Sequence, residues 1–167
     1  KEILDVINGD LRTKYEDQSH IRCSSSCSQC IQRWENRFFT DLNWRLGLDI
    51  AALANGENLS MHLWFPRVEE AARQLIKGWL NEQVIVHEVT TMQNETLYAL
   101  VNPEIKKAAL IGHPLWLRTS SALNEYQAEG RYLLKSEFDI DADENVLFTN
   151  LFEIEKSPIH VATHLIT

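Results

Sequence analysis

Apolar residues recur at helical spacing in the first half of the chain, whereas the second half carries short apolar runs. One clear helical pattern covers residues 66–81, where apolar side chains fall at positions i, i+3, i+4 and i+7. Pro66 suits the first turn of a helix because its missing N–H would be unpaired there in any case. Glu69 and Glu70 suit the positive end of the helix dipole. We therefore predict an amphipathic helix over 66–81.

Two more helical patterns precede this one. The first covers residues 2–16 and is interrupted by Gly9. The second begins at Cys27 and ends near Gly47. Its apolar positions are Cys27, Cys30, Ile31, Trp34, Phe38, Leu42 and Leu46. Residues 55–58 read Asn-Gly-Glu-Asn, which is typical of a turn.

After residue 81 the helical period stops and β-branched residues become common. Residues 83–91 and 96–101 predict a hairpin. We interpret 132–140 and 146–154 as two strands around an acidic turn, and 159–166 as a last strand. Residues 103–107 favour a short helical turn after Pro103. The segment 119–129 fits either a capped helix or one arm of a hairpin.

This order of elements predicts an α+β fold, with N-terminal helices packed on a C-terminal, mostly antiparallel sheet. The helical part covers about 1–81 and the β-rich part about 82–167. A chain of 167 residues can bury a sizeable core, and it shows no repeat and no clear linker. We therefore expect a single domain over 1–167.

The net charge of –8 argues against nucleic acid or an anionic membrane as a partner, because both require clustered Lys and Arg. Lys106 and Lys107 are the only adjacent basic pair. No run approaches the ~20 apolar residues of a membrane helix, and the N-terminus lacks the pattern of a signal peptide. The chain starts without Met, which suggests a processed product or an excised domain. Three cysteines, an odd number, fit a reducing compartment, so we expect a cytoplasmic protein.

The three cysteines, Cys23, Cys27 and Cys30, are clustered within eight residues. Their spacings of four and three place them within about 60° of one helix face, and Trp34 and Phe38 continue that face. A free cysteine behaves as a small buried hydrophobe. We therefore favour core packing as the reason for the spacing.

Metal or redox chemistry is the alternative for this cluster. The spacing resembles that of radical S-adenosylmethionine enzymes, which implies an iron–sulfur cluster, but Gln29 stands where those enzymes have an aromatic residue. His20 with the three cysteines has the ligand number of a zinc site, and His160 with His164 offers a more distant half. Cys27-Ser-Gln-Cys30 at the start of a helix would also suit a dithiol redox pair.

A second candidate metal site is the acidic segment that starts at Asp139. Asp139, Asp141 and Asp143 resemble the first three ligands of an EF-hand calcium loop. Glu144 replaces the glycine of that loop, and Asn150 replaces its bidentate glutamate. An exposed acidic turn between two strands is the simpler interpretation.

The catalytic residues of this chain, if any, are unknown from sequence. A Gly-rich phosphate loop, a Gly-x-Ser-x-Gly elbow and a His-Glu-x-x-His pair are all missing from the sequence. His87 and His113 could line a pocket. We expect a non-enzymatic interaction or ligand-sensing module, a regulatory or assembly domain of a larger system that needs no cofactor. Its partner would be a protein, a small ligand or a second copy of the chain. The rivals are a metal-binding or dithiol redox protein and a small-molecule enzyme with its site under the sheet.

Overall fold

The computed structural model describes residues 43–57, 59, 61, 64–80, 83–90, 96–116 and 121–167. The chain divides into two compact units, Lys1–Ser60 and Met61–Thr167, and each is described by itself. The single domain expected from the sequence stays a prediction.

In the first unit the structure describes one helix, α3 (Trp44–Ala54). The side chain of Asn43 caps it by accepting a hydrogen bond of 3.2 Å from the backbone three residues further on. A separate helix thus begins at Trp44 and continues through Gly47, so the predicted helix from Cys27 to Gly47 is wrong over its last residues, while 27–42 lie outside the described residues. An interior glycine costs only about 1 kcal/mol relative to alanine, which the rest of the helix can offset. The predicted turn is confirmed: Asn55 ends the helix, and Gly56 has a φ of 79°, which favours glycine.

The second unit is built on a four-stranded sheet with the order β1-β2-β3-β4. Its strands are β1 (Ile85–Thr90), β2 (Thr96–Asn102), β3 (Lys107–Gly112) and β4 (Val146–Asn150). Its helices are α4 (Phe65–Trp79), α5 (Ser121–Phe138), α6 (Ala142–Asn145), α7 (Leu151–Lys156) and α8 (Pro158–Ile166). The β1–β2 and β2–β3 pairs are antiparallel, whereas β3 and β4 are parallel. The α+β class is confirmed, with a mixed sheet.

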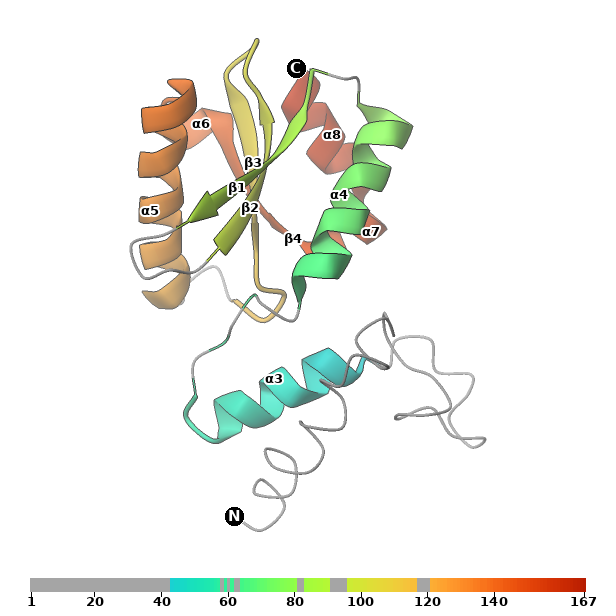
Figure 1. Ribbon diagram of the computed structural model, residues 1–167, viewed down its shortest axis with the longest axis vertical. Helices are drawn as coiled ribbons and strands as arrows, with labels where there is room; N and C mark the ends of the chain where they lie inside the picture. Colours follow the sequence, from blue (N-terminus) through green and yellow to red (C-terminus); the bar gives the residue numbers. More distant parts are fainter. Residues whose placement is uncertain are drawn as a thin grey trace. The chain divides into compact units, whose positions relative to one another are not determined.

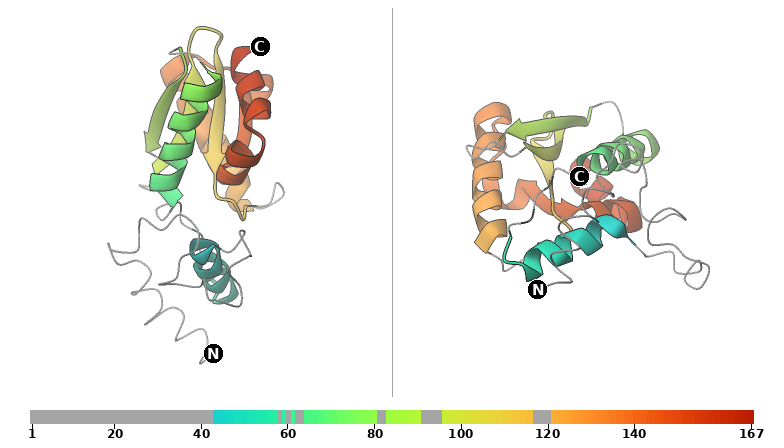
Figure 2. Two further views of the ribbon diagram at one scale, coloured as in Figure 1. Left: turned by 90° about the vertical axis from the view of Figure 1, so that its right-hand side faces the viewer. Right: turned by 60° about the horizontal axis from the view of Figure 1, so that its bottom comes forward.

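Helices cover both faces of this sheet. The orange helix α5 lies against one face, while α4, α7 and α8 lie against the other (Figure 1). Figure 2 shows the green α4 and the red α8 side by side on that second face. Parallel pairing of β3 with β4 requires a crossover, which α5 provides. Whether the helices before residue 61 pack on the sheet stays a prediction.

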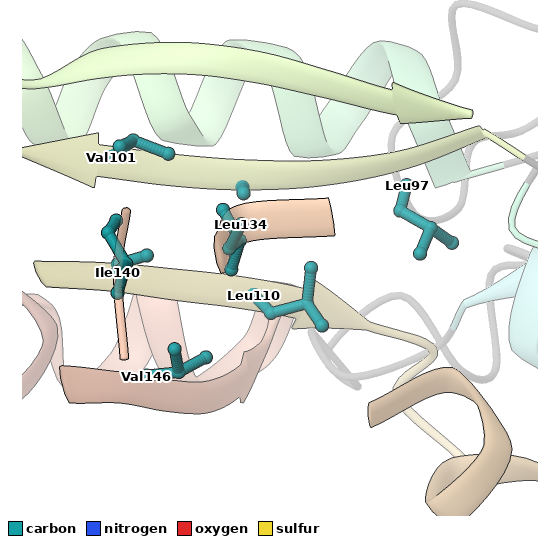
Figure 3. Close-up of a cluster of buried hydrophobic side chains, with 8 residues drawn as sticks. Leu97, Val101, Leu110, Leu134, Ile140 and Val146 are labelled. Atoms are coloured by element: carbon teal, nitrogen blue, oxygen red, sulfur yellow. The ribbon is translucent and has the colours of Figure 1, made fainter. Parts of the chain in front are cut away.

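The α5 face holds the main apolar cluster of the unit. Figure 3 shows Leu110 of β3 and Leu134 of α5 among the buried side chains that fill it. Each large apolar side chain buried in this way contributes ~1.5–3 kcal/mol. Gly130 allows the close approach of helix and strand, because a Cβ on it would lie 2.4 Å from Leu110 Cδ2.

Helix α8 packs on the opposite face of the sheet, and its His164 covers the end where β3 and β4 begin. His164 Nε2 lies 3.1 Å from the carbonyl oxygen of Ala108 and 3.3 Å from that of Asn145. Burial lowers the pKa of His164, since the charged ring would be poorly solvated there. Asn102 of β2 donates a hydrogen bond of 2.9 Å to the carbonyl of Leu165. Both contacts fix α8 on the sheet.

The sequence prediction was wrong for three segments of the second half. Residues 132–140 belong mainly to α5, residues 151–154 to α7 and residues 159–166 to α8, instead of to strands. For the segment 119–129, which fits either a helix or a hairpin arm by sequence, the structure shows the start of α5 at Ser121. In α8 the buried positions are Val161, Ala162 and Leu165, a helical spacing, and Pro158 starts the helix. β-branched residues suggested a strand, but the buried face decided the outcome.

The other elements agree better with the sequence. Helix α4 and the β1–β2 hairpin are confirmed. Residues 103–106 form a turn, and β3 follows directly. No strand is predicted there from the sequence. The signal of β3 was the continuous apolar run at 108–111, typical of a strand buried on both faces. None of the helices in the described residues has the length and apolar character to cross a membrane.

Candidate functional site

The candidate site lies where the two parallel strands end. Gly112 of β3 is paired with Asn150 of β4, so both strands finish at the same edge of the sheet. The chain leaves β3 there toward α5 and leaves β4 toward α7. In sheets with parallel strands, ligands bind outside the carboxyl ends of the strands, where connections diverge to opposite faces.

A pocket of about 350 Å³ opens at this edge. The volume lies within the ~300–1,000 Å³ range of small-molecule sites. The residues that line it come from β3, β4, α5, α7 and the turn after β3. They are Gly112, His113, Trp116, Gln127, Arg131, Val146, Leu147, Phe148, Thr149, Asn150 and Glu153. Aromatic and aliphatic side chains thus alternate with polar groups, which is typical of ligand pockets.

The turn after β3 sets the positions of His113 and Trp116. The backbone N–H of Trp116 donates a hydrogen bond of 3.0 Å to the His113 carbonyl, and that of Leu115 donates one of 3.0 Å to His113 Nδ1. This hydrogen bond to Nδ1 fixes the orientation of the imidazole ring in the turn. Gly112 lets the Trp116 ring lie close to the strand end, since a Cβ there would be 3.2 Å from the ring.

On the α7 side, β4 and α7 together orient a carboxylate. Thr149 Oγ1 donates a hydrogen bond of 3.0 Å to Glu153 Oε2. Asn150 caps α7, and its side-chain oxygen accepts a hydrogen bond of 3.1 Å from the Glu153 N–H. Both the backbone and the side chain of Glu153 are therefore held in place beside the pocket.

On the α5 side, the pocket is lined by a cation. The guanidinium carbon of Arg131 lies 5.1 Å from the centre of the Phe148 ring, within the range of a cation–π contact. Phe148 in turn packs against the apolar cluster beneath α5. The guanidinium is therefore supported by a side chain anchored in the core.

Aromatic contacts support the pocket from behind. Trp64, which is fully buried, makes edge-to-face contacts with His113 at 5.7 Å and with Phe152 at 5.8 Å between ring centres.

An ion pair joins the two helices beside these rings. Arg67 of α4 donates two hydrogen bonds, of 2.9 and 2.7 Å, to the two carboxylate oxygens of Glu155 on α7. This forked pairing ties α4 to α7. The polar residues of the pocket therefore stand on well-packed elements.

The predicted cysteine site lies outside the described residues. This applies to Cys23, Cys27, Cys30 and His20, so core packing and the metal or redox alternatives all stay predictions. His160 and His164 both lie on α8, where His164 Nε2 is engaged by two backbone carbonyls. Within the described ranges no group of three or more His, Cys, Asp or Glu side chains is arranged to hold a metal ion.

The acidic segment is described in part. Asp139 has a φ of 54°, and its carboxylate pairs with Lys106, which lowers the pKa of Asp139. Asp141 pairs with Lys135 at 2.9 Å. Two of the three proposed calcium ligands thus have lysine partners. The side chain of Asp143 lies outside the described part, and calcium binding stays a prediction.

Sequence reasoning missed most of the pocket. Of its lining residues, only His113 is a pocket candidate from the sequence. His87, the other candidate, lies on β1, where its Nε2 is 2.6 Å from Glu137 Oε2 and its ring contacts Phe138. Arg131 and Glu153 carry no local signal, since a charged residue on a helix is ordinarily solvent-exposed.

Comparison with known proteins adds no relative: no protein-family model, no curated protein and no solved structure matches this chain.

Proposed function

We propose that the Met61–Thr167 unit is a ligand-binding module that holds a small molecule in the pocket at the ends of β3 and β4. The observation that carries the proposal is the convergence of polar side chains from four elements on one pocket of about 350 Å³. We further propose a regulatory or assembly role in a larger system, in which the bound ligand changes how the unit contacts a partner protein.

Binding without catalysis is the simpler use of this pocket. Two of the titratable side chains that line it are already directed toward protein groups. His113 accepts a hydrogen bond from Leu115, and Glu153 accepts one from Thr149. Side chains fixed in this way favour a preformed recognition surface, which limits the ordering cost of binding.

A pair of tryptophan substitutions on α5 tests the proposal. Gln127 lines the pocket, whereas its neighbour Ala128 is exposed and does not line it. Gln127→Trp should fill the pocket, while Ala128→Trp adds the same side chain outside it. The 167-residue chain would be screened with a panel of metabolites by thermal unfolding.

A ligand present at 100 times its Kd stabilises the folded state by about 2.7 kcal/mol. We expect at least one compound to raise the Tm of the wild-type chain and of Ala128→Trp, but not of Gln127→Trp. If no compound raises the wild-type Tm, or if both variants respond equally, the pocket is not a ligand site.

A further inference from the structure

Two opposite charges reach the pocket from opposite faces of the sheet. Phe148 points toward α5, where Arg131 lies over its ring. Successive side chains of a strand point to opposite faces, so Thr149 and its partner Glu153 lie on the α7 side. The two sides correspond to the orange and red helices that flank the sheet in Figure 1. The pocket therefore has a positive wall and a negative wall.

Each charge has a distinct recognition chemistry. A guanidinium presents several N–H donors in a planar fork, which matches phosphate or carboxylate oxygens. An ionised carboxylate such as that of Glu153 only accepts hydrogen bonds, and its two oxygens suit a pair of neighbouring N–H donors. A ligand that satisfies both walls carries an anionic group at one end and N–H donors at the other.

The third feature is the aromatic wall. Trp116 lines the pocket, and Gly112 keeps the strand end clear of its ring. The backbone hydrogen bond of 3.0 Å from Trp116 to the His113 carbonyl holds the residue in its turn. A flat ring stacks favourably on an indole of this kind, and nucleobases do so regardless of sequence because each has a π face.

We propose that the pocket binds a nucleoside monophosphate, with the phosphate at Arg131, the base against Trp116 and the N–H edge of the base at Glu153. This inference rests on the proposed ligand-binding function and names its ligand class. Guanine fits best, because its ring N–H and its amino group are adjacent donors. A free amino acid also has two charges, but it is smaller and leaves the aromatic wall unused.

Titration calorimetry with the 167-residue chain separates the three contacts. The probes are guanosine 5′-monophosphate, guanosine and ribose 5-phosphate. We expect the nucleotide to bind more tightly than either fragment, since only it reaches both walls. Adenosine 5′-monophosphate should bind roughly tenfold or more weakly, because adenine has a ring acceptor beside its amino group and so lacks two adjacent donors for Glu153.

Variants assign each contact to a wall. Arg131→Met should weaken binding of the nucleotide roughly 10- to 100-fold and leave guanosine nearly unchanged. Arg73→Met is its control, because Arg73 is an exposed residue paired with Glu69 on α4. Glu153→Gln should weaken the nucleotide about tenfold and leave ribose 5-phosphate unchanged, with Glu70→Gln as control. If Arg131→Met does not fold, Arg131→Lys keeps the charge and tests whether the planar N–H donors of the guanidinium are needed for binding.

The outcomes distinguish the ligand class from the binding function. Equal binding of nucleotide and ribose 5-phosphate, or equal effects of Arg131→Met and Arg73→Met, would overturn the nucleotide proposal. If another compound binds and Gln127→Trp abolishes its binding, the nucleotide proposal fails while the ligand-binding function holds. If no compound binds the wild-type chain at all, both fail.

Discussion

The two ends of the parallel pair β3–β4 differ in how their polar groups are satisfied. At the end where the strands start, the His164 ring contacts the carbonyl oxygens of Ala108 and Asn145. At the end where they finish, Gly112 and Asn150 border a pocket of about 350 Å³. One end is closed by a side chain of the protein, and the other is open to a ligand.

We infer that side chains at the closed end stabilise the fold, whereas side chains at the open end serve a site. His164 has partners within the protein, so its loss removes these hydrogen bonds and costs stability. The polar groups around the open end also have partners within the protein, but they line a space that a ligand can occupy. We therefore expect substitutions at the closed end to change the free energy of unfolding, and substitutions at the open end to change affinity.

The largest expected effect concerns Gly130, which brings α5 against β3 and so builds one wall of the open end. Gly130→Val should lower the free energy of unfolding by about 2–3 kcal/mol, because the new side chain meets the completely buried Leu110. Gly78→Val is the control: no atom lies within 4 Å of a Cβ at Gly78, so a change below about 0.5 kcal/mol is expected. Urea unfolding measures both, and equal losses would contradict the close approach of α5.

At the closed end, His164→Ala should cost roughly 1–3 kcal/mol, since two carbonyl oxygens lose their donor. His160 lies on the same helix but is exposed, so His160→Ala should stay within about 0.5 kcal/mol of the wild type. Chemical denaturation of the two variants provides the measurement. A similar cost for both would mean that His164 does not close this end.

The same histidine predicts a pH dependence. Burial lowers the pKa of His164 in the folded state, so the unfolded chain binds the proton more readily. Its contribution to stability is fully present above the unfolded pKa, near ~6.5, and is lost as pH falls through the lowered folded pKa. The stability difference between wild type and His164→Ala should therefore shrink below about pH 6.5. A difference that grows on acidification would reverse this assignment.

The smallest expected effect on stability lies at the open end. Glu153→Gln keeps the shape of the side chain, and the Asn150 cap is made by the backbone N–H of residue 153. We expect a change within about 0.5 kcal/mol in the free energy of unfolding. Thermal unfolding without ligand checks this. A loss comparable to that of His164→Ala would show that Glu153 serves the fold instead of the pocket.

Local patterns in the sequence were sufficient for some elements. Helix α4 has a clean apolar period and a proline at its start, and the β1–β2 hairpin has two β-branched runs separated by a polar segment. They were insufficient for α7 and α8, which are short and rich in residues that suit either state. In such segments the packing partner selects the conformation.

The pocket could not be predicted from the sequence, for a different reason. Its walls come from residues between 112 and 153, and they meet only because β3 and β4 pair in parallel with α5 as the crossover. His113 was a candidate, but Arg131 and Glu153 were not, since a helix position alone does not reveal which pocket a charge lines.

The sequence by itself determined the α+β class, helix α4 and the β1–β2 hairpin, because these depend on periodicity over neighbouring residues. The tertiary structure decided the helical state of 151–156 and 158–166 and the parallel pairing of β4 with β3. It also decided that one end of that pair is closed by His164 and the other left open. Those features depend on contacts between residues far apart in the chain, where pairing and burial outweigh local preference.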